Sequence, residues 1–485
     1  MDDIALHRFA VVKFFPILLI MNTLVKTRFA PSPTGLMHLG NARTALFSAL
    51  YAYHHGGIFL LRIEDTDRER SRPHLALQLM EDLKWLGLSW QEGPHTSGQH
   101  GPYYQSERSD IYNHYYKQLQ PHVYPCFCSP QELAISRKIQ LSMGQAPRYA
   151  GTCAHLTAQE VQVKLEKGLK PTLRFRVPKG QTIQFIDLVK GPQRFLSDDL
   201  GDFIIRRAEG SPAFFFCNAL DDALMGVTHV LRGEDHLTNT PRQILILQAL
   251  QLPIPHYGHI SLILGHDGSP LSKRNGSQSI WELKNHGWLA EGVINYLARL
   301  GHSYTQDHFL SLEELAKEFS TERLVRSPAR FDDQQLHHWQ QMAISHLGED
   351  QLWEWMNVQA LVPPHLKPSF ITAVRPNITY PQDAWHWAKI LFEEPLTLQP
   401  DASKMIQEAG PAFFQHALTA LEESQADYQK LVHQLKKLTG TKGKALFMPI
   451  RSAWTGETHG PEMVHLLPLL GLEKARQRLQ ACLQS

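Results

Sequence analysis

One segment, residues 24–63, restricts the possible folds of this chain more than any other. Residues 24–29 have the length and composition of a strand, and the breaker cluster PSPTG at 31–35 ends it. Over residues 39–54 the apolar side chains recur at the spacing of one helix face. Residues 58–63, IFLLRI, are apolar on both faces, as in a parallel strand buried between helices. The segment therefore predicts a βαβ unit and an α/β fold.

A second α/β stretch lies much further along the chain. Residues 227–231 are a strand candidate, and residues 241–250 read as a helix whose first-turn proline suits position N1. We expect the two stretches to form one open parallel sheet that is split by an insertion of about 90 residues. Ligands in such sheets bind beyond the carboxyl ends of the strands, so charged residues at those ends are the candidates for function.

From about residue 311 the strand signals fade, and amphipathic helices broken by Pro and Gly dominate. Ser311, with Glu314 three residues later, has the pattern of a capping box that opens the first of these helices. Residues 411–440 are the clearest helical stretch. The sequence thus predicts an N-terminal α/β half with an insertion, followed by an all-helical C-terminal half.

Charge and composition limit which classes of function are possible for this chain. The chain has 48 Lys and Arg against 47 Asp and Glu, a formal charge of +1, which excludes a uniformly basic nucleic-acid coat but not a local basic face. One basic stretch lies in the C-terminal half, although solvated helix faces look the same; it comprises Lys436, Lys437, Lys442, Lys444 and Arg451. Five cysteines are too few for a disulfide framework in 485 residues, so we expect a reducing compartment.

The only candidate for a targeting segment is the apolar run at residues 9–20. It is too short to span a bilayer, Lys13 and Pro16 interrupt it, and a second methionine, Met21, follows it. We interpret residues 1–20 as a disordered extension without function, with a membrane tether as the alternative. No other apolar run approaches the length of a membrane span, so we expect a cytoplasmic protein without a membrane partner.

The first motif with chemical meaning is PSPTGLMHLGN, residues 31–41, between the first strand and the helix. The breakers turn the chain sharply, and the helix N-terminus then presents unpaired N–H groups and a positive dipole end, which bind anions. His38 could donate to a phosphate oxygen, and Gly40 would let a flat base approach the backbone. A strand, loop and helix with one histidine is also common without any ligand, so this motif alone leaves a purely structural role open.

Charged residues follow two of the expected strands. RIEDTD, residues 62–67, comes at the end of the strand at 58–63, and VLRGEDH, residues 230–236, ends the later one. Carboxylates this close together repel one another unless cations or donors meet them. A ligand site at the sheet edge would supply such partners, whereas a solvated turn or a surface ion pair is the alternative.

A polar loop at residues 266–276 brings two adjacent cations, Lys273 and Arg274, next to Gly276. An ammonium group there suits a clamp over a triphosphate, where it stabilises the charge that spreads to the leaving pyrophosphate. The three residues Ser-Lys-Arg have no specificity alone, and only their position after the other motifs gives them weight.

Cys126-x-Cys128, followed by Cys153-x-His155, places four metal-type ligands in two pairs. Such a set suits a tetrahedral zinc ion that orders loops unable to build a core. Because the spacings within the pairs are tighter than usual, a pair of buried free cysteines is the alternative. A zinc ion here would be structural, since a closed site leaves no coordination position for a substrate.

The strings RFAPSPTG-x-x-HLG-N-AR, residues 28–43, and LRIEDTD, residues 61–67, resemble the class I aminoacyl-tRNA synthetases and are similar to those of bacterial glutamyl-tRNA synthetases. The resemblance extends from residue 26 to residue 483 and includes LFMPIRSAWTGETHGPE at 446–462. It implies that L-glutamate is activated with ATP, which carries Mg²⁺, and is transferred to the 3′ end of tRNA(Glu). Members of the family are usually monomers, and their first step generally waits for tRNA to bind.

The same resemblance implies the fold class: an α/β, Rossmann-like catalytic domain with an inserted acceptor-binding subdomain, followed by an all-α anticodon-binding half. The expected boundaries are 21–110 and 201–258 for the catalytic domain, 111–200 for the inserted zinc-like subdomain, 259–330 for the KMSKS-loop and stem-contact region, and 331–485 for the anticodon-binding helices.

Residue by residue, the resemblance assigns ligands to the positions that match the family motifs. The ATP site would comprise His38, Gly40, Asn41, Ser272, Lys273 and Arg274. The glutamate site would comprise Arg28, Ala30, Ser32, Glu64, Phe214 and Arg232. Within it, Arg28 would suit a glutamate carboxylate, Glu64 the ammonium group and Arg232 the side-chain carboxylate. Zn²⁺ would be bound by Cys126, Cys128, Cys153 and His155, with Tyr149 as the alternative fourth ligand.

The sequence departs from the family pattern at three positions. Phe214 replaces a tyrosine near the glutamate, Pro270 stands at the first lysine of the KMSKS pattern, and Asn275 replaces a histidine. The lost hydroxyl removes one hydrogen bond, which is worth about 0.5–1.5 kcal/mol. Two alternatives therefore stay open: an enzyme that also or mainly glutamylates tRNA(Gln), and a non-catalytic tRNA-binding paralogue.

Overall fold

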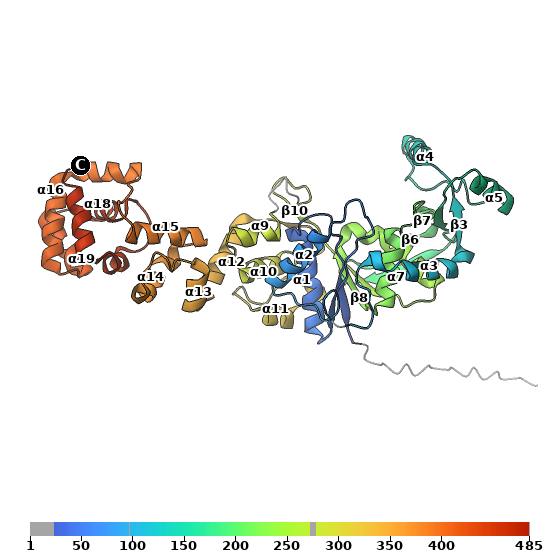
Figure 1. Ribbon diagram of the computed structural model, residues 1–485, viewed down its shortest axis with the longest axis horizontal. Coiled ribbons are helices and arrows are strands. Elements are labelled where there is room, and N and C mark those ends of the chain that lie inside the picture. Colours follow the sequence, from blue (N-terminus) through green and yellow to red (C-terminus); the bar gives the residue numbers. More distant parts are fainter. Residues whose placement is uncertain (1–23, 97, 272–277, 485) are drawn as a thin grey trace, which may run out of the picture.

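The computed structural model describes residues 24–96, 98–271 and 278–484. An α/β body lies in the middle, an inserted segment with helices α4 and α5 lies at one end, and the C-terminal helices lie at the other (Figure 1). The predicted extension at 1–20 and the predicted ATP contacts Ser272, Lys273 and Arg274 lie outside the described residues. The arrangement confirms the predicted fold class, an α/β half with an insertion and a helical C-terminal half.

The predicted βαβ unit is present. Strand β1 (Lys26–Phe29) pairs in parallel with β2 (Ile58–Leu61), and helix α1 (Leu39–His54) connects them. The helix has the predicted bounds. Gly57 follows it, and a Cβ at that position would lie 2.1 Å from the Val25 carbonyl oxygen. Only glycine allows the chain to turn back so tightly onto β1.

The second predicted stretch completes the α/β body. Strand β8 (His229–Gly233) pairs in parallel with β9 (His256–Ile260), and α8 (Thr240–Ala249) connects them. The Thr228 N–H donates to the Lys26 carbonyl at 2.9 Å, so β8 runs next to β1. The carboxyl ends of β1, β2 and β8 therefore meet at one edge, where open α/β sheets bind ligands.

The inserted segment has its own antiparallel sheet. β4 lies between β3 and β7, and a separate hairpin is formed by β5 and β6. The third strand of this sheet, β7, lies after residue 200, so the sheet includes strands from both sides of that position. The elements are α3 (Ser109–Gln118), β3 (Val123–Cys126), α4 (Pro130–Ser142), α5 (Ala158–Glu166), β4 (Thr172–Phe175), β5 (Thr182–Asp187), β6 (Gly191–Leu196), α6 (Ser197–Leu200) and β7 (Phe203–Arg206). Helices α2 (Pro73–Trp85) and α7 (Phe214–Leu224) belong to the α/β body.

Beyond β9 the described residues form mainly helices, together with a short parallel pair of strands, β10 (Ile263–Leu264) and β11 (Ala329–Arg330). The helices are α9 (Ile280–Asn285), α10 (Ala290–Arg299), α11 (Leu312–Glu318), α12 (Asp333–His346), α13 (Glu349–Met356), α14 (Lys367–Val374), α15 (Pro381–Phe392), α16 (Pro400–Ser424), α17 (Tyr428–Thr439), α18 (Lys444–Thr455) and α19 (Met463–Ala481). The capping box at Ser311 is confirmed. In the described part of the chain, no helix is long and apolar enough to cross a membrane.

The predicted helical stretch 411–440 is confirmed as helical and is divided between α16 and α17. Gln425 and Ala426 adopt left-handed backbone conformations and separate α16 from α17. Asp427 then caps α17 by accepting from the Lys430 N–H at 3.1 Å. The break lets both helices pack into the same core, which contains Leu421 and Leu431. A single straight helix would have carried one of these apolar faces away from that core.

Asp82 on α2 allows a prediction about stability. Its side chain is fully buried, Oδ1 accepts from Gln78 at 2.8 Å, and Oδ2 has no hydrogen-bond partner among the described residues. Burial raises the pKa of this carboxyl to about 6. Because the folded pKa lies above the unfolded one, the ionised carboxylate destabilises the fold above pH 6, and stability is regained as the pH falls.

We therefore expect Asp82→Asn to raise the free energy of unfolding by about 1–2 kcal/mol at pH 8, and by less at pH 5. Urea denaturation of both proteins at the two pH values measures the difference. Glu423→Gln, at an exposed position outside α2, is the control and should change little at either pH. A gain that is equal at pH 8 and pH 5 would contradict the assignment.

Candidate active site

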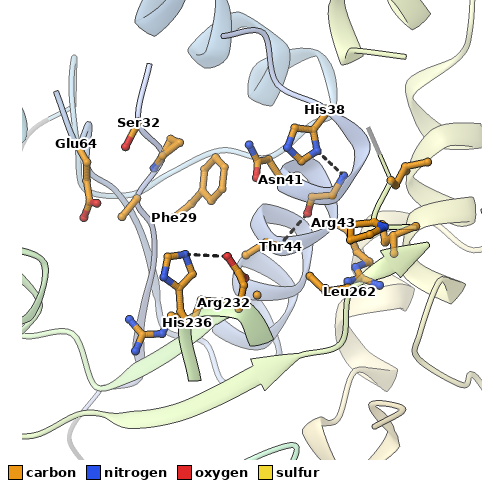
Figure 2. A pocket seen from close by; sticks show the side chains of 18 of the residues that line it. Phe29, Ser32, His38, Asn41, Arg43, Thr44, Glu64, Arg232, His236 and Leu262 are labelled. Atoms are coloured by element: carbon orange, nitrogen blue, oxygen red, sulfur yellow. Dashed lines mark hydrogen bonds and ion pairs between the residues drawn. The ribbon is translucent and has the colours of Figure 1, made fainter. Parts of the chain in front are cut away.

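A pocket of about 590 Å³ lies where β1, β2 and β8 end and α1 begins. It is lined by nine of the residues predicted from the sequence: Arg28, Ala30, Ser32, His38, Gly40, Asn41, Glu64, Phe214 and Arg232. Ser32 and Glu64 lie on one side of it, and His38 and Asn41 on the other (Figure 2). Segments more than 200 residues apart in the sequence thus form one cavity, which also takes in Pro270 and Leu271.

The wall formed by α1 is suited to an anion. His38 is the N-cap of α1, and its Nδ1 accepts from the Gly40 N–H at 3.1 Å. In a neutral ring the proton is then on Nε2. A Cβ at position 40 would lie 3.0 Å from the imidazole, so glycine leaves room for this cap. The first turn of α1 has no acidic residue that would offset the positive end of its dipole.

The opposite wall holds a buried cluster of charges. Arg62 pairs with Asp222 at 2.7 Å and with Glu64 at 2.9 Å, and Asp222 also accepts from Arg28 Nε at 3.2 Å. Burial raises the pKa of Glu64, although Arg62 opposes the shift. Two arginines therefore face two carboxylates, and each charge is held by a partner rather than by solvent.

Arg232 differs from Arg28 and Arg62 because none of its described partners is a carboxylate. Its Nε donates to His259 Nε2 at 3.1 Å, and its Nη2 donates to Thr240 Oγ1 at 2.8 Å and Gln243 Oε1 at 2.7 Å. Nη1 has no hydrogen-bond partner among the described residues. Burial lowers the pKa of Arg232 to about 10, so the guanidinium stays charged at neutral pH. A buried cation with two unused N–H groups at a pocket wall is a binding site for an anion such as a carboxylate.

Three further residues at this site were not predicted from the sequence. Asn218 Nδ2 donates to Glu64 Oε1 at 2.6 Å, and Gln243 Nε2 donates to Asn218 Oδ1 at 2.8 Å. The His236 ring lies 5.2 Å from that of Phe214, and both line the pocket. The available signal for Asn218 was one amide in the otherwise apolar stretch FFFCNAL, on a helix face that turns out to be buried.

The cysteine cluster of the inserted segment forms a second, separate site. The sulfur atoms of Cys126, Cys128 and Cys153 all lie within 4.8 Å of one another. The Tyr149 hydroxyl lies 3.4 Å from Cys126 Sγ and 3.5 Å from Cys128 Sγ. His155 is exposed and is not part of this group. The predicted cysteines are thus brought together, whereas Tyr149, the alternative, stands where His155 was expected.

The two neighbouring thiols of this cluster differ in their electrostatics, and burial raises the pKa of Cys128 to about 11. Burial would raise the pKa of the Cys126 thiol, but hydrogen bonds from Tyr149 and Arg174 outweigh it and lower the pKa to about 7. Three sulfur donors and one phenolic oxygen within contact of one another match the four ligands of tetrahedral zinc.

Comparisons with known proteins agree with this geometry. Residues 24–338 match the family described as tRNA synthetases class I (E and Q), catalytic domain, and residues 311–483 match an anticodon binding domain. The chain is 58% identical over 464 residues to glutamate–tRNA ligase 2 of Nitrosococcus oceani, covering 95% of this chain and 98% of the relative. It is 54% identical over 459 residues to glutamate–tRNA ligase 1 of Methylococcus capsulatus, covering 94% and 98%.

A solved structure is similar over the same extent. It is that of a glutamate tRNA ligase from Elizabethkingia meningosepticum in complex with its amino acid. The TM-score is 0.85 at 29% identity, and the match covers 95% of this chain and 99% of the other. The two chains therefore share their order of domains as well as the fold of each.

Proposed function

This chain belongs to the class I tRNA synthetases of the E and Q group, and we propose that it is a glutamate–tRNA ligase that activates L-glutamate with ATP and transfers it to tRNA(Glu). The observation that carries the proposal is Arg232, a buried and charged guanidinium with unused N–H groups at the pocket wall. A glutamate side-chain carboxylate would pair with that charge, whereas the neutral amide of glutamine would leave it unpaired. The relatives named glutamate–tRNA ligase support the same choice.

In the first step, a glutamate α-carboxylate oxygen attacks the α-phosphorus of ATP and pyrophosphate leaves. We expect the two reactants to be bound by charge, with Arg232 and Glu64 at the amino-acid end and His38 with the N-terminus of α1 at the phosphate end, since all three residues line the pocket. No side chain forms a covalent bond, so the catalysis derives from positioning and from stabilisation of phosphate charge. Mg²⁺ carried with ATP would supply further neutralisation of that charge.

In the second step, a terminal ribose hydroxyl of tRNA takes the glutamyl group and AMP leaves. The helical C-terminal half that matches an anticodon binding domain would hold the far end of the tRNA. Its exposed lysines, Lys436 and Lys437 in the last turn of α17, suit phosphate contacts whose strength falls with salt.

Charging assays test the proposal. Purified tRNA(Glu) and tRNA(Gln) are incubated separately with the enzyme, ATP and labelled glutamate. Charging of tRNA(Glu) alone is the expected result. Charging of tRNA(Gln) as well would identify an enzyme of relaxed tRNA specificity, and charging of neither would overturn the proposal in favour of a non-catalytic paralogue.

We also propose that Cys126, Cys128, Cys153 and the Tyr149 hydroxyl bind one structural zinc ion. The expected zinc content of the purified protein is about one ion per chain. His155→Ala should keep that zinc content, whereas Cys126→Ser should lose it. Tyr149→Phe should bind zinc less tightly, so that a weaker chelator removes the ion from this variant than from the wild type. Metal analysis before and after dialysis against chelators provides the measurement. Zinc-free wild-type protein, or zinc loss on His155→Ala alone, would refute this ligand set.

A further inference from the structure

We propose that Asp187 and His259 position Arg232, so that the β5–β6 hairpin of the inserted segment completes the site that selects glutamate. This inference rests on the proposed function and extends it to two residues that lie behind the pocket wall. Neither residue lines the pocket, and both are almost fully buried. They are positioning residues because they act on the substrate only through Arg232.

Asp187 is fixed at the end of β5. Its Oδ1 accepts from the backbone N–H groups of Val189 at 2.9 Å, Lys190 at 2.8 Å and His259 at 3.1 Å. Its Oδ2 lies 2.5 Å from His259 Nδ1. Burial would raise the pKa of Asp187, but these hydrogen bonds outweigh it and lower the pKa. The carboxylate is thus held as an anion that both closes the turn after β5 and faces the ring of His259.

The Asp187 carboxylate fixes the tautomer of His259. A carboxylate can only accept, so the proton of the neutral imidazole stands on Nδ1 and the lone pair on Nε2. That lone pair accepts from Arg232 Nε at 3.1 Å. Burial lowers the pKa of His259, which keeps the ring neutral. A protonated ring, or one with its proton on Nε2, would instead direct an N–H at the Arg232 cation.

A chain of hydrogen bonds connects Arg232 to Glu64, the residue predicted to bind the ammonium group of glutamate. Arg232 Nη2 donates to Gln243 Oε1, Gln243 Nε2 donates to Asn218 Oδ1, and Asn218 Nδ2 donates to Glu64 Oε1. Because the Arg232 guanidinium can only donate, each amide must present its oxygen to the preceding donor, and the directions of these hydrogen bonds follow from Arg232. One buried chain of contacts therefore orients both ends of the predicted glutamate site, and leaves Arg232 Nη1 for the substrate.

The chain of contacts crosses from the inserted segment into the α/β body. Asp187 belongs to the hairpin, while His259 belongs to β9 and Arg232 to β8. The Leu188 N–H also donates to the Tyr257 carbonyl at 2.8 Å, which seats the hairpin on β9. Thr240 and Gln243 of α8 hold Nη2 of Arg232, whereas the acceptor for its Nε is fixed only when this hairpin is docked, so the segment that interrupts the sheet is part of amino-acid selection.

The decisive variant is Asp187→Asn, which keeps the size of the side chain and an oxygen for the backbone N–H groups. Its amide N–H would face His259 Nδ1, move the ring proton to Nε2 and oppose Arg232 Nε. We expect the KM for glutamate in tRNA(Glu) charging to rise about 10- to 100-fold. The KM for ATP and the thermal midpoint should stay near the wild-type values, which a general loss of structure would not allow.

The matched control is Arg326→Gln. Arg326 Nε donates to the Val189 carbonyl at 3.0 Å, so it holds the other side of the same turn without contacting His259. This variant should keep the wild-type KM for glutamate. A rise equal to that of Asp187→Asn would show that any loosening of the turn has the same effect, and would overturn the positioning role.

Two substitutions of His259 separate hydrogen bonding from packing if Asp187→Asn lowers the thermal midpoint. His259→Gln can offer an N–H to Asp187 and an oxygen to Arg232, whereas His259→Leu offers neither. Glutamate KM should therefore be closer to wild type in His259→Gln. Wild-type enzyme that does not charge tRNA with glutamate refutes the proposed function itself. Wild-type charging with an unchanged glutamate KM in Asp187→Asn, or with equal KM values in the two His259 variants, refutes only the positioning role.

Discussion

Arg232→Gln is expected to lower kcat/KM for glutamate in tRNA(Glu) charging by about 100- to 1,000-fold. The substitution removes the positive charge that would pair with the side-chain carboxylate, in a pocket wall where water cannot replace it. It also removes the donors to His259 and Thr240, so both lose a partner. Initial rates of charging at varied glutamate concentration measure the change.

Two comparisons show whether this loss comes from the charge at that position. Arg232→Lys keeps a cation, but its three N–H groups lie on one nitrogen and cannot reach the partners that Nε and Nη2 of the guanidinium contact while also facing the pocket, so it should recover only part of the activity. Arg194→Gln removes an exposed arginine from β6 and should leave kcat/KM unchanged. Retention of wild-type kcat/KM in Arg232→Gln would exclude Arg232 from glutamate binding.

The pocket could be predicted because its main residues sit at strand ends and in one helix-start motif. Arg28, His38 and Glu64 lie within one βαβ unit, where the sequence order itself places them at the same sheet edge. Arg232 follows the same rule from β8. The family resemblance then supplied their roles, which residue types and spacing alone had left open.

The residues that orient this pocket could not be predicted in the same way. Asp187 and His259 are 72 positions apart, and Asn218 and Glu64 are 154 apart. Each looks ordinary in its own strand or helix, and its function exists only after the inserted hairpin and α7 pack against the α/β body. A local pattern contains no information on such pairings.

Two features that the sequence left undecided depend on the local path of the backbone. The stretch 411–440 keeps its helical spacing through Gln425 and Ala426, so periodicity does not reveal that both residues are left-handed. His155 has the right spacing from Cys153, but the loop brings the Tyr149 hydroxyl to the sulfur atoms instead. In both cases the spacing along the sequence fits more than one structure. The path of the backbone determines which of them forms.

His38 combines two roles that one substitution can separate. The imidazole caps α1 through Nδ1, and in the proposed function the proton on Nε2 would donate to a phosphate oxygen. Asparagine is a good N-cap but has no group at the position of Nε2. We therefore expect His38→Asn to retain the wild-type thermal midpoint while kcat for charging falls about 100- to 1,000-fold.

His38→Ala provides the contrast, because alanine removes the cap as well as the donor. It should lose about as much kcat and, in addition, about 0.5–2 kcal/mol of folding free energy. Charging rates and thermal melts of the three proteins distinguish the two contributions. If His38→Asn kept its kcat, the imidazole would serve only to begin α1, and the stabilisation of phosphate charge would have to come from the helix N-terminus and from residues outside the described range.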